Sequence, residues 1–375
     1  MLFQAAARSN SRPQAPLPGD LAGRPSDLIF SALATFAAAA LVSYLLAIPE
    51  RHLATRAGMV DRPDERRKHT GIRARVGGVS MYLAFVAGLL VSRHPLDPKL
   101  ASVLVGAAVC LAVALLDDKL RPPSRELPPV VQFAGQLLAA GIAIAFGVSI
   151  VAIRDPRIGG PFGGLLHFPL VIAVPVTLFW ITGTINTVNF LDGMDGLAAG
   201  VVAIGAAVLA FASVRLNQPG VALECLALTG AAAGFLPHNL PPARQFMGSS
   251  GSWFLGYTLA TMSIIGGAKL STALLVIGVP VFDVALLIVL RSLRRQPFWR
   301  GDRGHLFHRL LDVGLSQRKT LVLYYGISAA FGAYALAFTS LHSSGWGVKI
   351  YGFVGLLLVV GAILAYLTRK RPAAS

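Results

Sequence analysis

Long apolar runs restrict this chain more than any other feature of its sequence. We expect eleven spans, at about residues 27–48, 77–92, 100–116, 130–150, 165–186, 197–214, 219–236, 252–268, 271–290, 320–341 and 346–368. Most of these runs approach the ~20 residues that an α-helix needs to cross a bilayer. Of the 375 residues only 13% are charged, and a soluble domain carries about twice that share. The sequence therefore predicts an all-α, polytopic integral membrane protein with about 11 transmembrane helices.

Two short tails flank one expected membrane domain. Residues 1–26 contain Pro, Arg and Ser without the charged-then-apolar order of a signal peptide, so we expect a disordered tail. Residues 27–368 are expected to form a single membrane domain, followed by a basic C-terminal tail at 369–375. Cys110 and Cys225 lie in separate apolar runs, a spacing that indicates neither a disulfide framework nor a zinc site.

The basic residues predict the orientation of the chain in the membrane. If the loop after the first span is cytoplasmic, that side carries 23 Lys and Arg and the other side carries 10. The excess predicts an outside N-terminus and a cytoplasmic C-terminus. Loop sidedness thereby explains the net charge of +16 without a nucleic acid partner. The polar clusters described below then all face the cytoplasm, where we expect the active site.

A polar stretch at 186–196 separates two apolar runs. Its carboxamides and carboxylates recur at every third position, as Asn186, Asn189, Asp192 and Asp195. Neighbouring pairs would share a helix face, but a drift of about 60° per step prevents a single stripe. Gly193 and Gly196 allow the backbone to break there. Oxygen ligands beside glycines at the mouth of a membrane helix favour a Mg²⁺ and phosphate site, and helix capping is the alternative.

Adjacent carboxylates end the third expected span. Asp117 and Asp118 follow directly after Leu115 and Leu116. Two neighbouring carboxylates repel each other, so they need a metal ion, basic partners or a change in protonation. The alternative interpretation is a solvated helix end, since Lys119 follows.

Two basic loops indicate phosphate binding. The loop at 61–78 holds Arg66 and His69 among further bases, although positive-inside charge alone would also place bases there. The loop at 301–310 holds His305, His308 and Arg309. These three side chains suit a pyrophosphate whose charge grows as it is cleaved, and a basic amphipathic helix on the membrane surface is the alternative.

Asp283 is an isolated carboxylate within the ninth expected span. An intramembrane Asp is a functional candidate by default, and a structural hydrogen bond near a kink at Pro280 explains it equally well. A secondary transporter that uses Asp283 and Glu224 is a rival hypothesis. Such a transporter needs polar groups near the midplane, whereas most polar residues here cluster toward one face.

Taken in order, these clusters resemble the polyprenyl-phosphate N-acetylhexosamine-1-phosphate transferases, over about residues 50 to 325. The motifs that carry the resemblance are Asp61-x-Pro63-x-x-Arg66, Gly77-Gly78, Asp117-Asp118, Asn186-x-x-Asn189-x-x-Asp192-Gly193-x-Asp195-Gly196, Phe246-Met247-Gly248, Gly251-Ser252 and His305-Leu306-Phe307-His308-Arg309-Leu310. The final His-Arg-Leu is similar to the branch that transfers GlcNAc-1-phosphate to undecaprenyl phosphate. The phospho-MurNAc-pentapeptide branch is the alternative.

The resemblance implies a reaction and its substrates. A phosphate oxygen of the polyprenyl phosphate attacks the β-phosphorus of a UDP-N-acetylhexosamine, and UMP leaves. The expected cofactor is Mg²⁺, or Mn²⁺ in its place. The expected location is the bacterial cytoplasmic (inner) membrane. The expected protein is multi-pass, with a homodimer among the states that the resemblance allows, and it starts an envelope polysaccharide such as lipopolysaccharide or teichoic acid.

The resemblance also assigns roles to individual residues. Asp117 would position or deprotonate the lipid phosphate beside Asp118. Asn189 would face the metal ion, together with position 249. Asp195 would hold the uridine, and Phe246 would stack on the uracil. The remaining catalytic assignments are Asp192, His305, His308 and Arg309, and the remaining substrate-binding assignments are Asn186, Arg66 and His69.

Two departures from the family pattern concern the expected metal and phosphate site. Ser249 occupies the position of an Asp that binds Mg²⁺ in the family, and a neutral hydroxyl is a poor ligand for a hard dication. Gln132 replaces a Lys. These departures leave two hypotheses open: a transferase with an altered site, and a family member that binds nucleotide sugar or lipid phosphate without turnover.

Overall fold

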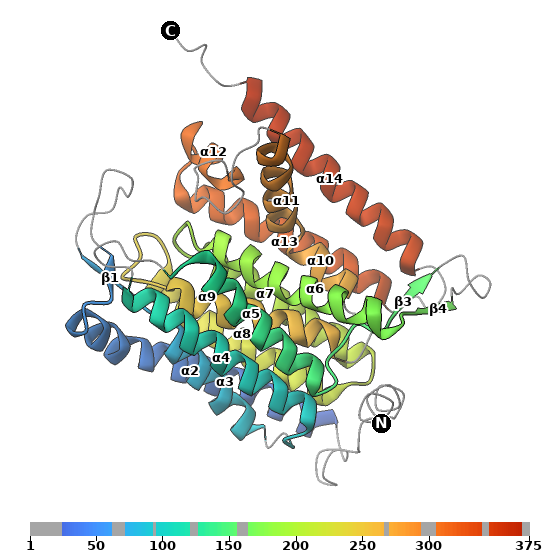
Figure 1. Cartoon of the computed structure of the whole chain (residues 1–375), viewed down its shortest axis with the longest axis horizontal. Helices are drawn as coiled ribbons and strands as arrows, with labels where there is room; N and C mark the ends of the chain where they lie inside the picture. Colours follow the sequence, from blue (N-terminus) through green and yellow to red (C-terminus); the bar gives the residue numbers. More distant parts are fainter. Residues whose placement is uncertain are drawn as a thin grey trace.

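The computed structural model describes residues 25–61, 72–92, 95–120, 127–155, 164–265, 270–293, 305–339 and 345–369. Most of these residues are helical (Figure 1). The helices are α2 (Pro25–Arg56), α3 (Gly78–Val91), α4 (Pro98–Leu120), α5 (Pro129–Ala145), α6 (Leu170–Leu191), α7 (Leu197–Arg215), α8 (Pro219–Asn239), α9 (Gly248–Ile264), α10 (Leu270–Val276), α11 (Gly278–Leu293), α12 (Leu306–Asp312), α13 (Gln317–Thr339) and α14 (Gly345–Arg369). Every expected span coincides with at least one of them.

The long apolar helices confirm a multi-pass membrane protein. Among the described residues six helices, namely α2, α4, α6, α7, α8 and α13, are long and apolar enough to cross a bilayer. The pair α10 and α11 passes the same test together but is bent by 79°. The expected span at 271–290 is therefore broken into two helices, and whether the pair crosses the membrane as one span stays a prediction. The break lies at Ile277, and Pro280 sits in the first turn of α11, where a proline costs no hydrogen bond. The count of eleven spans and the orientation of the termini stay predictions.

Short strands correct the all-α prediction. One sheet has the order β1 (Val60–Asp61), β2 (Arg73–Arg75) and β5 (Gln245–Phe246), with β1 antiparallel and β5 parallel to β2. A hairpin pairs β3 (Ala152–Asp155) with β4 (Gly164–His167). The two sheets lie at opposite ends of the helices (Figure 1). The first sheet joins the end of α2 to the segment before α9.

A glycine seam joins α2 to α8. A Cβ added at Gly230 would lie 2.5 Å from the carbonyl oxygen of Phe36, and one at Gly234 would lie 2.1 Å from that of Ala40. No side chain fits at such distances, so the two backbones touch here. Small residues four apart are a common device for close helix packing in membranes. The hydroxyl of Ser43 adds a hydrogen bond of 2.7 Å to the Ala231 carbonyl.

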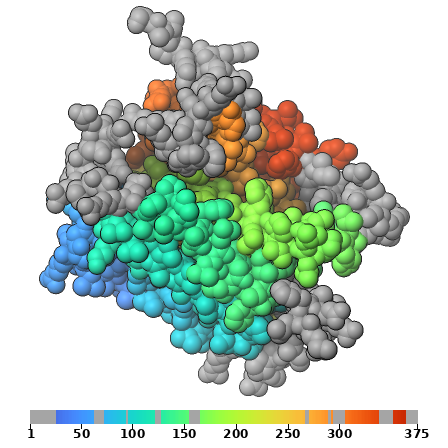
Figure 2. Space-filling view, viewed as in Figure 1, coloured from blue at the N-terminus to red at the C-terminus, as the bar shows by residue number. Residues whose placement is uncertain are grey.

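Helix α9 forms the centre of the bundle. Every residue of α9 from Gly248 to Ile264 is buried, and α9 packs mainly against α4 and α6. The space-filling view shows the face formed by α4, α5 and α6 (Figure 2). Helices α5 and α6 expose large apolar side chains, including Val130, Phe133 and Phe179. Helix α9 thus lies in the interior of the bundle. The apolar outer faces of α5 and α6 remain exposed for contact with lipid.

Candidate active site

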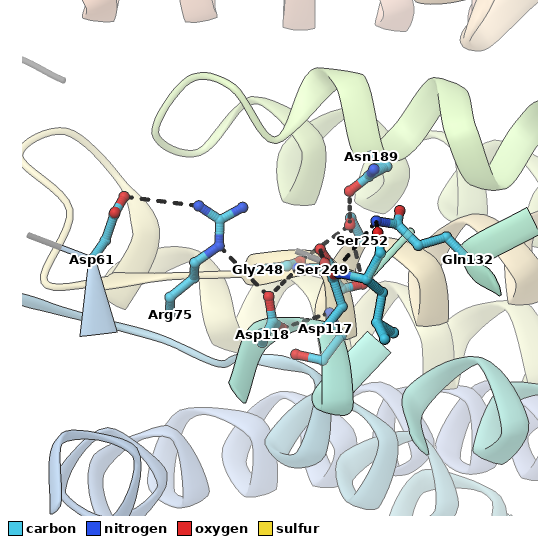
Figure 3. A network of polar contacts seen from close by, with 11 residues as sticks. Asp61, Arg75, Asp117, Asp118, Gln132, Asn189, Gly248, Ser249 and Ser252 are labelled. Atoms are coloured by element: carbon cyan, nitrogen blue, oxygen red, sulfur yellow. Dashed lines mark hydrogen bonds and ion pairs between the residues drawn. The ribbon is translucent and has the colours of Figure 1, made fainter. Parts of the chain in front are cut away.

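Asp117 joins three helices at the end of α4. Its side chain is fully buried. Oδ1 accepts hydrogen bonds from the Leu127 amide at 3.0 Å and from Nε2 of Gln132 at 3.3 Å. Oδ2 accepts a hydrogen bond from the Ser249 hydroxyl at 2.9 Å (Figure 3). The carboxylate is therefore held by α5 and α9 through donors that carry no formal charge.

Asp118 performs a different task from its neighbour. Its two oxygens accept the backbone amides of Ser249 and Ser250, each at 2.9 Å, which are the first free amides of α9. Arg75 lies beside it, with Nε 3.5 Å from Oδ1, and this arginine also reaches Asp61 (Figure 3). A carboxylate at a helix N-terminus is stabilised by the unpaired amides and the helix dipole. Asp118 thus fixes the start of α9, and Arg75 compensates its charge.

Gly248 makes this approach of α4 and α9 possible. Its φ of +72° lies in the left-handed region, where a side chain is disfavoured. An added Cβ would lie 2.7 Å from the Arg75 carbonyl oxygen and 2.7 Å from Oδ2 of Asp118. The Met247-Gly248 part of the motif is therefore a tight turn that presents the next residue, Ser249, to Asp117.

Asn189 reaches the same place from α6. Its Oδ1 accepts a hydrogen bond of 2.9 Å from the Ser252 hydroxyl (Figure 3). Ser252 lies one turn after Ser249 on α9, and its hydroxyl is 3.2 Å from the Ser249 carbonyl. The structure thus brings together the two residues predicted to bind metal. We call Asp117, Asp118, Asn189 and Ser249 the carboxylate cluster.

Asn186 is occupied by a helix–helix contact. Its Nδ2 donates to Oε1 of Gln136 at 2.7 Å, and Nε2 of Gln136 donates back at 3.3 Å. Nδ2 also lies 2.8 Å from the Thr182 carbonyl. Gln132 and Gln136 lie one turn apart on α5. Gln132 therefore contacts Asp117 of α4, and Gln136 contacts Asn186 of α6. These contacts fit a structural role for Asn186 better than the predicted substrate contact.

The chain between α6 and α7 is held by a glycine with a left-handed backbone and by hydrogen bonds that involve backbone amides. Asp192 is the C-terminal cap residue of α6 and is partly exposed. Gly196 has a φ of +77° and starts α7, and its amide donates to Oδ1 of Asn239 at 3.0 Å. Oδ2 of Asp195 accepts the amide of Ala243 at 3.0 Å. The stretch is therefore tied to the segment that follows α8.

Phe246 lies close to the same segment. It belongs to β5 and is partly exposed. The guanidinium carbon of Arg73 is 5.6 Å from the ring centroid, in range for a cation–π contact. The Arg73 guanidinium also donates to the Ala243 carbonyl, and the Ala243 amide bonds Asp195. The two residues predicted to hold uridine, Asp195 and Phe246, are thus linked through Arg73 and Ala243.

His305 is oriented by Asp283. Nδ1 of His305 lies 2.9 Å from Oδ2 of Asp283, and Oδ1 of the same carboxylate accepts the Leu306 amide at 2.9 Å. The partner of this intramembrane Asp is thus a histidine of the candidate pyrophosphate site. Each oxygen of Asp283 holds one group at the start of α12, and Nδ1 is the ring nitrogen of His305 that faces this carboxylate.

Helix α12 packs on the polar stretch at 186–196. The ring of His305 is 5.5 Å from the Phe190 ring. A Cβ added at Gly193 would lie 2.7 Å from the Phe307 ring, so this glycine admits Phe307. His308 and Arg309 are partly exposed on α12. Arg66 and His69 lie outside the described residues.

Comparison with known proteins assigns the family. The model of the family described as "Glycosyl transferase family 4" matches residues 100–267. A probable undecaprenyl-phosphate N-acetylglucosaminyl 1-phosphate transferase of Bacillus subtilis is 32% identical over 308 residues, which cover 80% of this chain and 83% of the relative. The chain belongs to glycosyl transferase family 4.

Two further relatives differ in the substrate that their names give. A decaprenyl-phosphate N-acetylglucosaminephosphotransferase of Mycobacterium tuberculosis is 34% identical over 331 residues, with 79% of this chain and 80% of the relative covered. A phospho-N-acetylmuramoyl-pentapeptide-transferase of Rubrobacter xylanophilus is 33% identical over 273 residues, with 69% and 80% covered. The stronger and longer matches are to the N-acetylglucosamine enzymes.

The carboxylate cluster of this family 4 member has few charged oxygens for a metal ion. Within the described residues, no group of three or more His, Cys, Asp and Glu side chains is arranged to hold a metal. Both oxygens of Asp118 accept amides of α9, so within the carboxylate cluster Asp117 is the carboxylate that faces Ser249. Mg²⁺ is commonly bound by one or two carboxylates together with substrate phosphates. The donor set fits an ion shared with a pyrophosphate.

Several residues of this family 4 site were missed from the sequence. Arg75 compensates Asp118, Gln136 holds Asn186, and Asn239 fixes Gly196. Arg75 carried a signal, because Arg73 to Val76 alternates basic and apolar residues with the period of a strand. Gln136 was detectable as the residue one helical turn after Gln132.

Proposed function

We propose that this chain transfers N-acetylglucosamine-1-phosphate from UDP-N-acetylglucosamine to a polyprenyl phosphate and releases UMP. The observation that carries the proposal is the double contact of the stretch at 186–196. It meets the carboxylate cluster through the Asn189–Ser252 hydrogen bond, and it meets His305 through Phe190. These two contacts support a shared site for the carboxylates and the candidate pyrophosphate ligands, as phosphoryl transfer requires.

The residues divide the reaction between them. An oxygen of the lipid phosphate forms a bond to the β-phosphorus of the UDP-sugar, and the bond from that phosphorus to the oxygen bridging to UMP breaks. Asp117 orients the lipid phosphate and takes its proton where one is present. His305, His308 and Arg309 neutralise the charge that develops on the pyrophosphate. Asp195 and Phe246 hold the uridine.

Mg²⁺ remains part of the proposal as an ion shared between protein and substrate. Asp117 and Asn189 would hold it, with the Ser249 hydroxyl as a weak third donor. When bound, the ion neutralises the phosphate oxygens during transfer. The single available carboxylate predicts a higher Mg²⁺ requirement than a site with two carboxylates would show.

The two departures from the family pattern lie on either side of one carboxylate. Ser249 and Gln132 both donate to Asp117, one to each oxygen. Relative to an Asp at 249 and a Lys at 132, the chain lacks one negative and one positive charge. The summed charge of the three positions is therefore the same. This balance supports a rearranged active site, in preference to a site that has simply lost a ligand.

A UMP-release assay tests the proposal. The full-length protein in detergent is supplied with undecaprenyl phosphate, Mg²⁺ and, in turn, UDP-N-acetylglucosamine, UDP-N-acetylgalactosamine and UDP-MurNAc-pentapeptide. We expect UMP release with UDP-N-acetylglucosamine that depends on the lipid phosphate and is lost in Asp117→Asn. Turnover with the pentapeptide substrate alone would assign the chain to the other branch.

Ser249 and Gln132 also motivate a second candidate function, binding without turnover. In that case every UDP-sugar fails at high Mg²⁺, yet UDP-N-acetylglucosamine still raises the thermal unfolding midpoint. A cytoplasmic location of the site, an inner-membrane location of the protein and a homodimer are further parts of the proposal. The positive-inside count supports the first of these.

A further inference from the structure

An open pocket lies at the end of α2, away from the carboxylate cluster. Its volume is about 730 Å³, within the usual range for small-molecule sites. The basic residues among those that line it are Arg51, His52, Arg56, Arg73 and Arg244. No member of the carboxylate cluster lines it. Arg73 borders both the pocket and Phe246, so the pocket adjoins the candidate nucleoside site without including it.

The walls of the pocket are fixed by the fold. Arg51 and Thr55, and likewise His52 and Arg56, are four residues apart, so two adjacent rows of α2 face one way. The opposite wall consists of 72–74 in and before β2 and of 242–244 after α8. Strand β5 directly follows the segment 242–244 and pairs with β2. This pairing holds the two parts of the wall together. The pocket is therefore formed without a ligand.

The positive charge in this pocket is not compensated within the described part of the chain. No carboxylate lines the pocket there, and none of its four arginines forms an ion pair. Glu50, the nearest acid along α2, instead accepts the amides of Val79 and Ser80. The C-terminal end of α2 carries only a partial negative charge, which is small beside the four arginines, so the pocket keeps a net positive charge that attracts an anion. Guanidinium groups match phosphate oxygens in geometry and charge.

An apolar stripe on α2 leads into the pocket. Leu41, Leu45 and Ile48 are 58%, 51% and 38% exposed, and their spacing of four and three places them on one helix face. His52 and Arg56 continue the same face at intervals of four. The stripe belongs to a helix long and apolar enough to span a membrane, so acyl chains can lie along it. The basic residues of the pocket follow at the end of the stripe, where the headgroup of such a lipid would lie.

We propose that this pocket binds the phosphate headgroup of an anionic glycerophospholipid whose acyl chains lie along the exposed stripe of α2. The stripe favours a lipid-borne phosphate over a free anion. Basic pockets beside membrane helices are suited to such headgroups. Bound there, the lipid joins α2 to β2 and to the segment that also bonds Asp195, and it anchors this end of the protein to the membrane surface.

Binding of short-chain phosphatidylglycerol to the full-length protein in a neutral detergent tests the proposal. We compare the unmodified chain with Arg56→Gln/Arg244→Gln, and with Arg318→Gln/Lys319→Gln as a control that loses the same charge from exposed positions at the start of α13. The pocket variant is expected to bind roughly 30-fold more weakly, about fivefold for each cation removed. The control is expected to bind normally, and phosphatidylcholine is expected to distinguish none of the proteins.

Further arms separate the sources of phosphate and the effects of misfolding. Arg56→Lys/Arg244→Lys retains both charges and is expected to retain most of the binding, at an unchanged unfolding midpoint. Equal losses in the pocket and control variants would overturn the proposal. So would displacement of the lipid by equimolar inorganic phosphate, or binding of undecaprenyl phosphate alone. UMP release is not measured, so the outcome is independent of the proposed transferase activity.

Discussion

The hydroxyl of Ser249 donates a hydrogen bond to Oδ2 of Asp117 over 2.9 Å, deep in the bundle. The other oxygen of that carboxylate, Oδ1, accepts a hydrogen bond from Nε2 of Gln132. Both partners are neutral, so the single negative charge of Asp117 is the only formal charge among these three side chains. Any substitution that restores one of the family charges alone must disturb this balance.

Restoring the acid alone is expected to harm the protein. Ser249→Asp would place a second carboxylate against buried Asp117, whose donors described above are all neutral, at a cost of about 3 kcal/mol in stability. The nearby cation, Arg75, already pairs with Asp118. Ser249→Asp/Gln132→Lys adds the cation on α5 and is expected to recover the unfolding midpoint. The double variant should also release UMP at lower Mg²⁺ concentrations than the unmodified chain. The measurements are thermal unfolding and a Mg²⁺ titration of UMP release.

Gln132→Lys alone provides the matching control for that experiment. It adds a cation beside Asp117 and is expected to leave the protein folded, with little change in its Mg²⁺ requirement. If Ser249→Asp by itself is stable and more active than the double variant, the charges at 132 and 249 are independent, and the coupling described here is wrong.

Asp283→Asn should impair catalysis by misorienting His305. The amide can still accept from the Leu306 amide but no longer offers a carboxylate to Nδ1 of His305, at 2.9 Å in the unmodified protein. We expect kcat to fall at least about tenfold, with a smaller change in KM, because a histidine that neutralises or transfers charge needs a fixed ring orientation. The pH profile of kcat is also expected to change.

Asp97→Asn supplies a control for loss of the negative charge at a helix cap. Oδ1 of Asp97 accepts the Leu100 amide at 2.7 Å, at the start of α4 and away from the cluster. This variant should lose a little stability and keep its kcat. Equal kcat values for Asp283→Asn and the unmodified chain would show that Asp283 only caps α12.

Gly248→Ala is expected to abolish turnover and to destabilise the fold by at least about 2 kcal/mol. The new methyl group would require a left-handed backbone and would contact both Arg75 and Asp118 at 2.7 Å. Gly141→Ala is the control, because its Cβ meets no atom within 4 Å. It should be neutral or slightly stabilising, since alanine favours a helix. Thermal unfolding and UMP release distinguish the two.

Phe246→Leu should weaken nucleotide binding without slowing the chemical step. The leucine keeps apolar volume in β5 but offers no ring for a base to stack on. We expect KM for the UDP-sugar, and the inhibition constant for UMP, to rise about tenfold with kcat nearly unchanged. Phe146→Leu, at the far end of α5, is the control and should change neither value. An unchanged KM in Phe246→Leu would remove this ring from the uridine site.

The sequence predicted the helices well because an apolar run marks a membrane helix whether its side chains face lipid or the interior of the bundle. Every expected span coincides with a helix, and the third ends at the buried pair Asp117 and Asp118. The break at Ile277 was only partly signalled: Gly278 and Pro280 follow it directly and a kink at Pro280 was considered, but the uniformly apolar residues around them favoured one continuous span. The short strands were missed because two or three residues carry too little periodicity to be recognised.

Motif spacing predicted which residues gather but not how they divide their work. Asn189 and Ser249 meet as expected, through the intermediary Ser252. Adjacent in sequence, Asp117 and Asp118 were given one role, yet successive helix positions point about 100° apart. One faces Ser249 and the other caps α9. The role of Asp283 also depended on a partner 22 residues away, which only the folded chain reveals.

The backbone contact between α2 and α8 decides where a lipid tail can enter the bundle. With Gly230 and Gly234 pressed onto the carbonyls of Phe36 and Ala40, no gate can open along this seam without pulling two helices apart. A polyprenyl phosphate that binds at Asp117, as proposed above, therefore has to enter from another side. The phospholipid proposed to bind α2 lies on the outer face of that helix, outside the α2–α8 contact. The phospholipid and the polyprenyl phosphate therefore do not compete for the same path.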